Sequence, residues 1–268
     1  MRRGKPRVVP IRCADEIALS REAGGLAARV LAMLTPHVQP GVSTEHLDQL
    51  CHDFIVDELH CVPTNIGYGG FPKTICTSVN HVVCHGIPSS GEILKDGDIV
   101  NVDVAVTTPQ GWIGDTSRMY YAGQPGNQAR RLVDATYEAL LAGIRAVKPG
   151  ATLGDVGFAI QSVAQRERFG VVREYCGHGI GTVYHDEPQV LHYGVPGQGL
   201  VLEPGMIFTI EPMLNAGKAA TRELSDGWTV ITNDKSLSAQ WEHMVVVTET
   251  GHDVLTRWPD GTGCYPPP

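Results

Sequence analysis

The sequence predicts an α+β protein of two similar halves, with helices segregated from antiparallel strand pairs. Two observations predict this class: a helix-like signature and a later strand-like signature each occur twice, in the same order. Their turn glycines keep a near-constant offset, because Gly41 and Gly150 are 109 residues apart and Gly97 and Gly205 are 108 apart. Such a repeat indicates two copies of one structural unit that meet near residues 122–130. The alternative is coincidence, since Pro-Gly and Gly-x-Ile pairs are common.

The helix-like signature consists of Pro-Gly, a Ser or Thr suited to helix capping, and apolar residues at helical spacing. Its two copies read QPGVSTEHLDQLCHDFIVDE and KPGATLGDVGFAIQSVAQRE. Another helix-like stretch precedes each copy, at about 16–34 and 128–147. We therefore expect a single domain over residues 1–268, with halves at about 16–121 and 128–248 and tails at 1–12 and 255–268.

The two copies of the strand-like signature, KDGDIVNVD and EPGMIFTIE, each end in a carboxylate six residues after the glycine, Asp103 and Glu211. After the first copy the chain turns at 107–111 and enters a second strand-like run that contains Asp115. A hairpin centred on Pro109 would place Asp103 directly opposite Asp115. Side chains in such a pair lie about 5 Å apart, so two bare carboxylates would repel each other strongly.

A divalent cation would relieve this repulsion, and two metals about 3.5–4 Å apart would use both carboxylates. Glu211 ends the apolar strand 206–210, and Glu242 precedes another β-branched run. Acidic residues on such strands are rarely buried without a partner. The four carboxylates therefore predict a shared ion. The alternative is that Asp103 and Asp115 face solvent on an edge strand.

Histidines beside glycine and proline turns add candidate nitrogen donors. His178 lies in CGHGIG, where glycine on both sides lets the backbone approach a site closely. His85 in CHGIP and His185 in YHDEP suit fixed donors at the rim of a site. Gly-His-Gly alone is weak evidence, so the residues themselves leave His178 open as a ligand or a loop histidine.

Composition and charge exclude several classes of protein. The net charge of −8 and the pI near 5.7 argue against a broad nucleic-acid surface, and the basic cluster Arg2, Arg3, Lys5 and Arg7 is typical of a solvated tail. No apolar run reaches the roughly 18 residues of a membrane helix, and the first residues lack a signal-peptide segment. The seven cysteines form no Cys-x-x-Cys pair, which favours reduced thiols. We expect a cytoplasmic protein without membrane or nucleic-acid partners.

Six motifs in order closely resemble type I methionine aminopeptidases: NHVVCHGIP, NVDVAV, GDTSRMY, CGHGIGTVYHDEPQVLHY, MIFTIEPM and SAQWEHMVVVT. The resemblance covers nearly the whole chain, and six motifs together are far more specific than any one. It implies the pita-bread fold, a pseudo-two-fold repeat of helices and antiparallel strands forming one curved sheet with a central dinuclear metal site. It also implies a bacterial-like form, since the chain lacks the zinc-binding N-terminal extension of eukaryotic type I enzymes.

The resemblance implies a ligand set of Asp103, Asp115, His178, Glu211 and Glu242. Two of these, Asp115 and Glu242, would bridge both ions, while Asp103 would bind one ion and His178 with Glu211 the other. One imidazole among carboxylates suits cobalt, manganese, iron or zinc alike, so the metal stays open. The same analogy suggests one sodium or potassium ion near Asn80, Val82 and Ser238.

The implied activity is removal of the N-terminal methionine from nascent proteins, preferentially when the next residue is small. His85 and His185 would contact the substrate amide and the developing oxyanion. The methionine pocket would be formed by Tyr68, Phe71, Cys76, Tyr184 and Trp228. Asn65 and Gly69 stand where the family often has a cysteine and a histidine, which affects the expected substrate preference but not the chemistry. We expect a monomer that acts on N-terminal Met peptides and on nascent chains near the ribosome.

We hypothesise that a water or hydroxide bridging the two ions attacks the first peptide carbonyl, with Glu211 taking its proton and returning it to the leaving amine. One rival is a proline-directed peptidase of the same fold, which usually carries an additional N-terminal domain. Another is a catalytically silent relative that binds protein or RNA. Such a relative is expected to have lost ligands, whereas all five residue types are present here.

Overall fold

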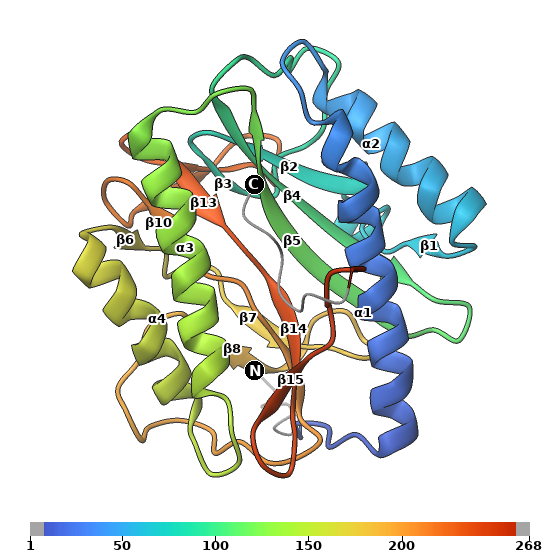
Figure 1. The fold of residues 1–268 in the computed structure, drawn as a ribbon, viewed down its shortest axis with the longest axis vertical. Coiled ribbons are helices and arrows are strands. Elements are labelled where there is room, and N and C mark those ends of the chain that lie inside the picture. Colours follow the sequence, from blue (N-terminus) through green and yellow to red (C-terminus); the bar gives the residue numbers. More distant parts are fainter. Residues whose placement is uncertain (1–7, 261–268) are drawn as a thin grey trace.

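The computed structural model describes residues 8–260, with helices packed over antiparallel strands (Figure 1). The basic cluster at residues 2–7 and Cys264 lie outside the described residues. None of the described helices combines the length and the hydropathy that a membrane span requires.

Four long helices lie where the repeat predicts them: α1 (Ala14–Leu34), α2 (Thr44–Asp53), α3 (Asn127–Ala146) and α4 (Leu153–Glu167). The residues that follow Pro-Gly in the two signatures cap the second helix of each pair. Ser43 accepts a hydrogen bond from the His46 N–H, and Thr152 accepts one from the Asp155 N–H. Short helical turns complete the set at η1 (Thr35–His37), η2 (Phe54–Glu58) and η3 (Tyr68–Gly70).

The strands of the described residues pair antiparallel in four sheets. One sheet holds β1 (Val62–Pro63), β4 (Asp98–Thr107), β2 (Ile75–Val79) and β5 (Ile113–Ala122). A second holds β15 (His252–Val254), β14 (His243–Val247), β9 (Ile207–Ile210), β7 (Gly177–Gly179) and β8 (Asp186–Val190). Two smaller sheets hold β13 (Ser238–Gln240), β10 (Met213–Asn215) and β6 (Gly170–Val171), and β11 (Thr221–Glu223), β12 (Val230–Thr232) and β3 (Val82–Cys84).

The predicted class of helices over antiparallel strands is confirmed. The strands of the expected curved sheet form four separately hydrogen-bonded sheets. A ladder ends between β13 and β14, where Trp241 and Glu242 belong to neither strand. Single hydrogen bonds still join the sheets at this break. The Glu242 N–H donates to the Ser117 carbonyl at 3.1 Å, and the Thr116 hydroxyl donates to the Glu242 carbonyl at 2.8 Å. Glu242 therefore lies where two sheets meet.

The predicted register of the β4–β5 hairpin is wrong by two residues. Asp103 pairs with Ser117, and Asp115 pairs with Ala105. Asp103 and Asp115 are therefore diagonal neighbours rather than direct partners. Because the side-chain period of a strand is two, a shift of two residues leaves both carboxylates on the same face of the sheet. The two carboxylates are therefore still neighbours, although the predicted pairing is wrong.

The cause of the error is the loop of the hairpin. Its last ladder pair joins Thr107 to Ile113, so the loop is centred on Gln110 rather than on Pro109. The Thr108 N–H donates to the Trp112 carbonyl at 2.8 Å, which closes a five-residue loop. Moving the centre by one residue moves every partner by two.

The chain is still part of the core at residue 255, where the C-terminal tail was predicted to begin. Leu255 and Thr256 are buried, and the Thr256 hydroxyl lies 2.8 Å from Nδ1 of His243. The Met244 N–H also donates to this hydroxyl, at 3.2 Å. The chain after β15 therefore contributes to the core beside β14.

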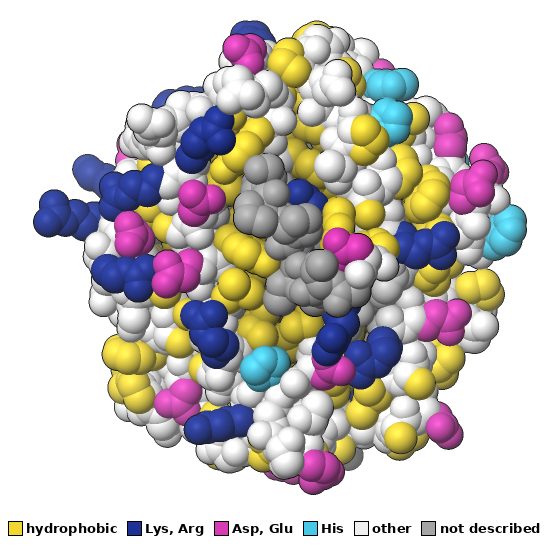
Figure 2. All heavy atoms as spheres, viewed as in Figure 1, with side chains coloured by type: hydrophobic (Ala, Val, Ile, Leu, Met, Phe, Trp, Pro, Cys, Tyr) yellow, Lys and Arg dark blue, Asp and Glu magenta, His cyan; other side chains and the backbone are white. Residues whose placement is uncertain are grey.

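Charged side chains of both signs are interspersed on the face shown in Figure 2. Ion pairs between Arg131 and Glu167 at 3.0 Å and between Arg166 and Glu138 at 2.7 Å join α3 to α4. These groups are largely exposed, so each pair contributes little to stability. The helices are held mainly by the apolar residues they bury against the strands.

Helix α1 crosses strand β5 at very short range (Figure 1). A Cβ atom added at Gly114 would lie 2.0 Å from the Ala23 carbonyl oxygen. The Tyr120 hydroxyl donates to the Leu31 carbonyl of the same helix at 2.7 Å. The absence of a side chain at position 114 therefore sets the distance between helix and strand.

Replacing Gly114 with alanine is expected to lower the free energy of unfolding by about 2–3 kcal/mol, because helix α1 must move away from β5. The shift is measured from the urea midpoint followed by circular dichroism. Gly25 in α1 provides the control, since a Cβ placed there meets no described atom within 4 Å apart from its chain neighbours and the backbone of its own helix. Gly25→Ala should raise the free energy of unfolding by about 0.5–1 kcal/mol through helix propensity. Equal midpoints for both variants would contradict the close packing.

Candidate metal centre

The structure brings the five predicted ligands around one cavity of about 200 Å³. Asp103 and Asp115 lie on the neighbouring strands β4 and β5. His178 lies on β7, and Glu211 and Glu242 adjoin β9 and β14. The cavity thus collects side chains from both larger sheets. A larger cavity of about 870 Å³ beside α4 is lined by neither histidine nor aspartate.

Asp115, His178 and Glu242 form the tightest part of this group. Each offers one ligand atom, and these atoms lie within 4.8 Å of one another. The Asp115 residue is 3% exposed, which contradicts the alternative that it faces solvent. Its Oδ1 atom has no hydrogen-bond partner within residues 8–260. A buried carboxylate oxygen without a donor is costly, and a divalent cation would satisfy it.

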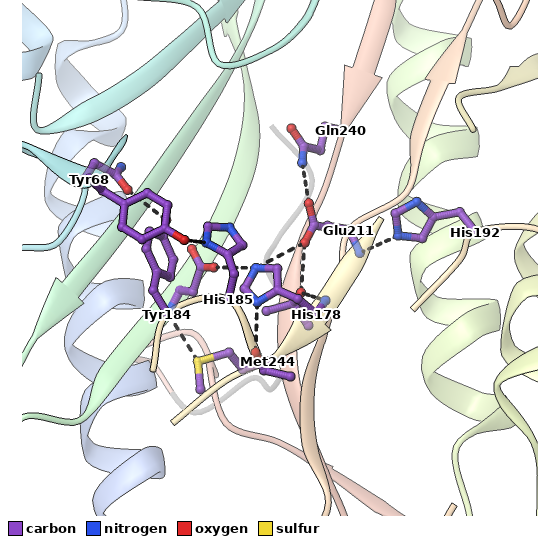
Figure 3. A network of polar contacts seen from close by, with 12 residues as sticks. Tyr68, His178, Tyr184, His185, His192, Glu211, Gln240 and Met244 are labelled. Atoms are coloured by element: carbon purple, nitrogen blue, oxygen red, sulfur yellow. Dashed lines mark hydrogen bonds and ion pairs between the residues drawn. The ribbon is translucent and has the colours of Figure 1, made fainter. Parts of the chain in front are cut away.

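The His178 ring is oriented toward the carboxylates (Figure 3). Its Nδ1 lies 3.1 Å from the Gly179 carbonyl, which can only accept, so this nitrogen carries the hydrogen. Nε2 then holds the free lone pair, 3.4 Å from Asp115 Oδ2 and 3.6 Å from Glu211 Oε1. A metal-binding histidine shows this arrangement, in which a backbone oxygen fixes the ring.

The electrostatics of the cluster favour a cation. Burial raises the pKa of Asp103 and of Glu242 well above the ordinary value, and neighbouring carboxylates raise both further. Burial likewise raises the pKa of Glu211 to about 7. Burial acts to lower the pKa of His178, but Asp115 and Glu211 raise it overall. Without a metal ion these groups therefore share protons near neutral pH, and a metal would replace those protons.

Three residues that the sequence analysis did not identify hold Glu211 in place (Figure 3). The Thr209 hydroxyl donates to Oε1 at 2.8 Å and accepts the His178 N–H at 3.0 Å. The Gln240 amide donates to Oε2 at 3.4 Å, and the Glu211 N–H donates to Nε2 of His192 at 3.2 Å. Thr209 was accessible to sequence reasoning, because it lies two residues before Glu211 and shares its face.

The other predicted catalytic and substrate-binding residues line the same cavity: Tyr68, Phe71, Cys76, His85, Tyr184, His185 and Trp228. Asn65 lines it as well, although it entered the sequence analysis only as a departure from the family. The Tyr184 hydroxyl donates to Asn65 Oδ1 at 2.7 Å, and the Asn65 amide donates to the Thr74 carbonyl at 3.2 Å. The Thr74 carbonyl can only accept, so the amide nitrogen of Asn65 must face it and Oδ1 must face Tyr184.

The predicted monovalent-cation residues lie beside one another but apart from this cavity. The Ser238 N–H donates to the Asn80 carbonyl at 2.8 Å. Val82 begins strand β3, where it pairs with Ile231. This hydrogen bond uses one of the two lone pairs of the Asn80 carbonyl oxygen, and a cation at this position stays a prediction.

A family model described as metallopeptidase family M24 matches residues 18–249. Methionine aminopeptidase from Escherichia coli (strain K12) is 53% identical over 254 residues, covering 95% of this chain and 96% of that protein. The crystal structure of methionine aminopeptidase from Rickettsia prowazekii matches with a TM-score of 0.91 at 52% identity, covering 93% of this chain and 100% of that one. These likenesses confirm the predicted fold class and the resemblance to methionine aminopeptidases.

A more distant structure shares the fold alone. The prolidase from Pyrococcus horikoshii OT3 matches with a TM-score of 0.73 at 19% identity, covering 92% of this chain and 63% of that one. The proline-directed rival therefore has the same framework, and the fold by itself does not choose between the two activities.

Adding a divalent metal should stabilise the protein more at pH 8 than at pH 5.5. The raised pKa of Glu211, about 7 against an ordinary 4.5, gives the metal-free protein a stabilising contribution that is complete below about pH 4.5. That contribution is lost as pH rises through 7. Metal binding replaces the proton, so the gain in Tm on adding Mn²⁺ should grow over this interval. Thermal unfolding at both pH values, with choline chloride at equal ionic strength as control, checks this. An equal gain at both would contradict it.

Proposed function

The chain belongs to metallopeptidase family M24, and we propose that it is an aminopeptidase that removes N-terminal methionine, preferentially when the next residue is small. One observation carries the proposal: the carboxylate and histidine cluster and an apolar pocket share a single small cavity. At about 200 Å³ the cavity is smaller than a typical pocket for a drug-sized ligand, which suits one side chain at a chain end. Its relatives named methionine aminopeptidase support the same activity.

The walls of the cavity suit a thioether side chain. Phe71 and Trp228 meet edge to face, with ring centroids 5.1 Å apart, and Tyr68 meets Tyr184 in the same way at 4.9 Å. Cys76 adds a buried, neutral thiol, since burial raises its pKa well above the ordinary value. Aromatic rings and sulfur atoms contact a methionine sulfur favourably. The carboxylates that line the same cavity favour the free amino group of a chain end over an internal peptide.

The residues present fit two divalent ions, held by Asp103, Asp115, His178, Glu211 and Glu242. Asp115 and Glu242 would contribute to holding both ions, Asp103 to holding one, and His178 with Glu211 to holding the other. Cobalt, manganese, iron and zinc all suit one imidazole among carboxylates. When bound, such ions lower the pKa of water and polarise a peptide carbonyl.

The protein groups supply proton transfer and hydrogen bonding. Glu211 accepts a proton from the attacking water and returns it to the leaving amine, and Thr209 and Gln240 hold its two oxygens in position. His85 and His185 donate hydrogen bonds to the amide and to the oxygen that becomes negative. Burial lowers the pKa of His85, and burial with the neighbouring His178 lowers that of His185 to about 4. Both rings are therefore neutral donors at pH 7.

The proposal extends to the setting in which the protein works. We propose that it acts in the cytoplasm as a monomer, on nascent chains near the ribosome, without direct nucleic-acid contacts. A sodium or potassium ion near Asn80, Val82 and Ser238 belongs to the same proposal. These statements rest on the resemblance to methionine aminopeptidases and on the charge of the chain.

The most informative test strips the metals, restores cobalt, manganese, iron or zinc singly, and compares Met-Ala-Ser with an Xaa-Pro peptide. We expect no turnover without metal and preferential cleavage of the Met-Ala bond with at least one ion. Released amino acids are quantified by mass spectrometry. Preferential cleavage of the Xaa-Pro peptide would overturn the substrate assignment in favour of the proline-directed rival.

Glu211→Ala should lower kcat by at least about 10²-fold, because both the proton acceptor and a ligand are lost. The fold should persist, as judged by the circular dichroism spectrum. Glu203→Ala is the matched control, since Glu203 is an exposed glutamate that precedes the same strand β9. Full activity of the Glu211 variant would reject its assignment.

A further inference from the structure

The side chains of Tyr68 and His185 are joined by a short hydrogen bond at the solvent-exposed rim of the cavity (Figure 3). The Tyr68 hydroxyl oxygen lies 2.7 Å from Nδ1 of His185. The His185 ring makes no other hydrogen bond to the described residues, so this contact decides how its two nitrogens are used. Tyr68 was expected only as a wall of the methionine pocket, and this contact gives its hydroxyl a separate task.

The chemistry of the two groups determines the direction of this hydrogen bond during the reaction. A neutral imidazole carries one N–H, and its other nitrogen accepts. A carbonyl oxygen that becomes negative can only accept, so the nitrogen facing it must carry the hydrogen. Nδ1 is already engaged by Tyr68, which leaves Nε2 for the substrate. Nδ1 must then accept, and the Tyr68 hydroxyl is the donor.

Neighbouring rings limit the orientation of His185. Tyr184 lies 4.3 Å away between ring centroids with a tilt of 38°, and His178 lies 4.2 Å away with a tilt of 50°. Tyr68 covers the ring as well, at 5.0 Å and 36°. A ring flip that exchanged Nδ1 and Nε2 would have to occur within this stack. The tautomer, rather than the ring orientation, is the variable that Tyr68 controls.

The backbone around Tyr68 fixes the position of its hydroxyl. Gly67, Gly69 and Gly70 have φ angles of 80°, 54° and 90°, which most side chains avoid. The Phe71 N–H donates to the Tyr68 carbonyl at 2.9 Å and closes the turn. A Cβ atom at Gly69 would lie 3.1 Å from Cη2 of Trp228. Glycine at position 69 thus lets the turn pack closely on Trp228 and present Tyr68 to His185.

We propose that Tyr68 is a positioning residue that holds His185 in the tautomer with its hydrogen on Nε2. This tautomer is the one that donates to the substrate oxygen as negative charge develops. The inference rests on the proposed function, because it assumes that His185 serves the reaction of an aminopeptidase. No covalent step is added: the hydrogen stays on Nε2, and the hydroxyl of Tyr68 keeps its own proton.

Tyr68→Phe tests this proposal because it removes the hydroxyl and keeps the aromatic wall. The full-length, zinc-loaded protein is assayed with Met-Ala-Ser at pH 8, where a histidine of ordinary pKa is neutral. We expect kcat to fall about 3–10-fold, as for the loss of one neutral hydrogen bond, with KM changed less than about twofold. An unchanged kcat would overturn the proposal.

The tautomer itself is read from the ring ¹⁵N chemical shifts of His185, assigned by comparison with His185→Gln. In the unsubstituted protein we expect a protonated Nε2 and an unprotonated Nδ1, and in Tyr68→Phe a mixture of both forms. Tyr184→Phe is the matched control for this spectrum, since its hydroxyl is bound to Asn65 and its removal should leave the His185 shifts unchanged. A lower kcat with unaltered His185 shifts in Tyr68→Phe would also overturn the proposal, because Tyr68 would then act on the substrate directly.

A failure of the proposed function and a failure of the positioning role of Tyr68 give different results. If the unsubstituted protein cleaves Met-Ala-Ser with none of cobalt, manganese, iron and zinc, the proposed function fails, whereas the ¹⁵N spectra of the zinc-loaded protein still decide the tautomer. If it cleaves the peptide and the His185 shifts are insensitive to the Tyr68 hydroxyl, only the positioning role fails.

Discussion

The mutual repulsion of buried carboxylates is the constraint on which the rest of the structure depends. Asp103, Asp115, Glu211 and Glu242 converge on one imidazole, and their raised pKa values or missing hydrogen bonds show that protein groups alone do not neutralise them. Such a cluster is stable only with bound protons or cations. The surrounding strands must therefore be held firmly enough to keep the carboxylates together. The capped helices and the close crossing of α1 over β5 supply that rigidity.

Irregular backbone adjoins three of the five predicted ligands, whereas Asp103 and Asp115 lie in the regular pairing of β4 with β5. The ladder is interrupted at Trp241 and Glu242, the pairing of β7 with β8 shifts between His178 and Gly179, and Glu211 directly follows the end of β9. A residue outside a regular ladder can turn its side chain toward a shared centre without following the alternation of a strand. The expected curved sheet is divided into separate sheets at such residues, and this division lets several strands contribute side chains to one site.

The sequence predicted those parts that follow from local periodicity. The helix signatures placed all four long helices, and a period of two kept Asp103 and Asp115 on one face even though the hairpin register was wrong. The contacts that orient Glu211 were less accessible to sequence reasoning, because His192 reaches it from the segment after β8 and Gln240 from β13. No local sequence pattern indicates these contacts. The hydrogen bond between Tyr68 and His185 was hidden for the same reason, since 117 residues separate the partners in the chain.

The order of the ligands along the chain has a consequence for protein synthesis. Asp103 and Asp115 are made early, whereas Glu242 is added 139 residues after Asp103. The cluster cannot assemble on a growing chain that is still short of Glu242, although its first helices and the β4–β5 hairpin are already complete. A chain at that stage therefore lacks the complete carboxylate and histidine cluster.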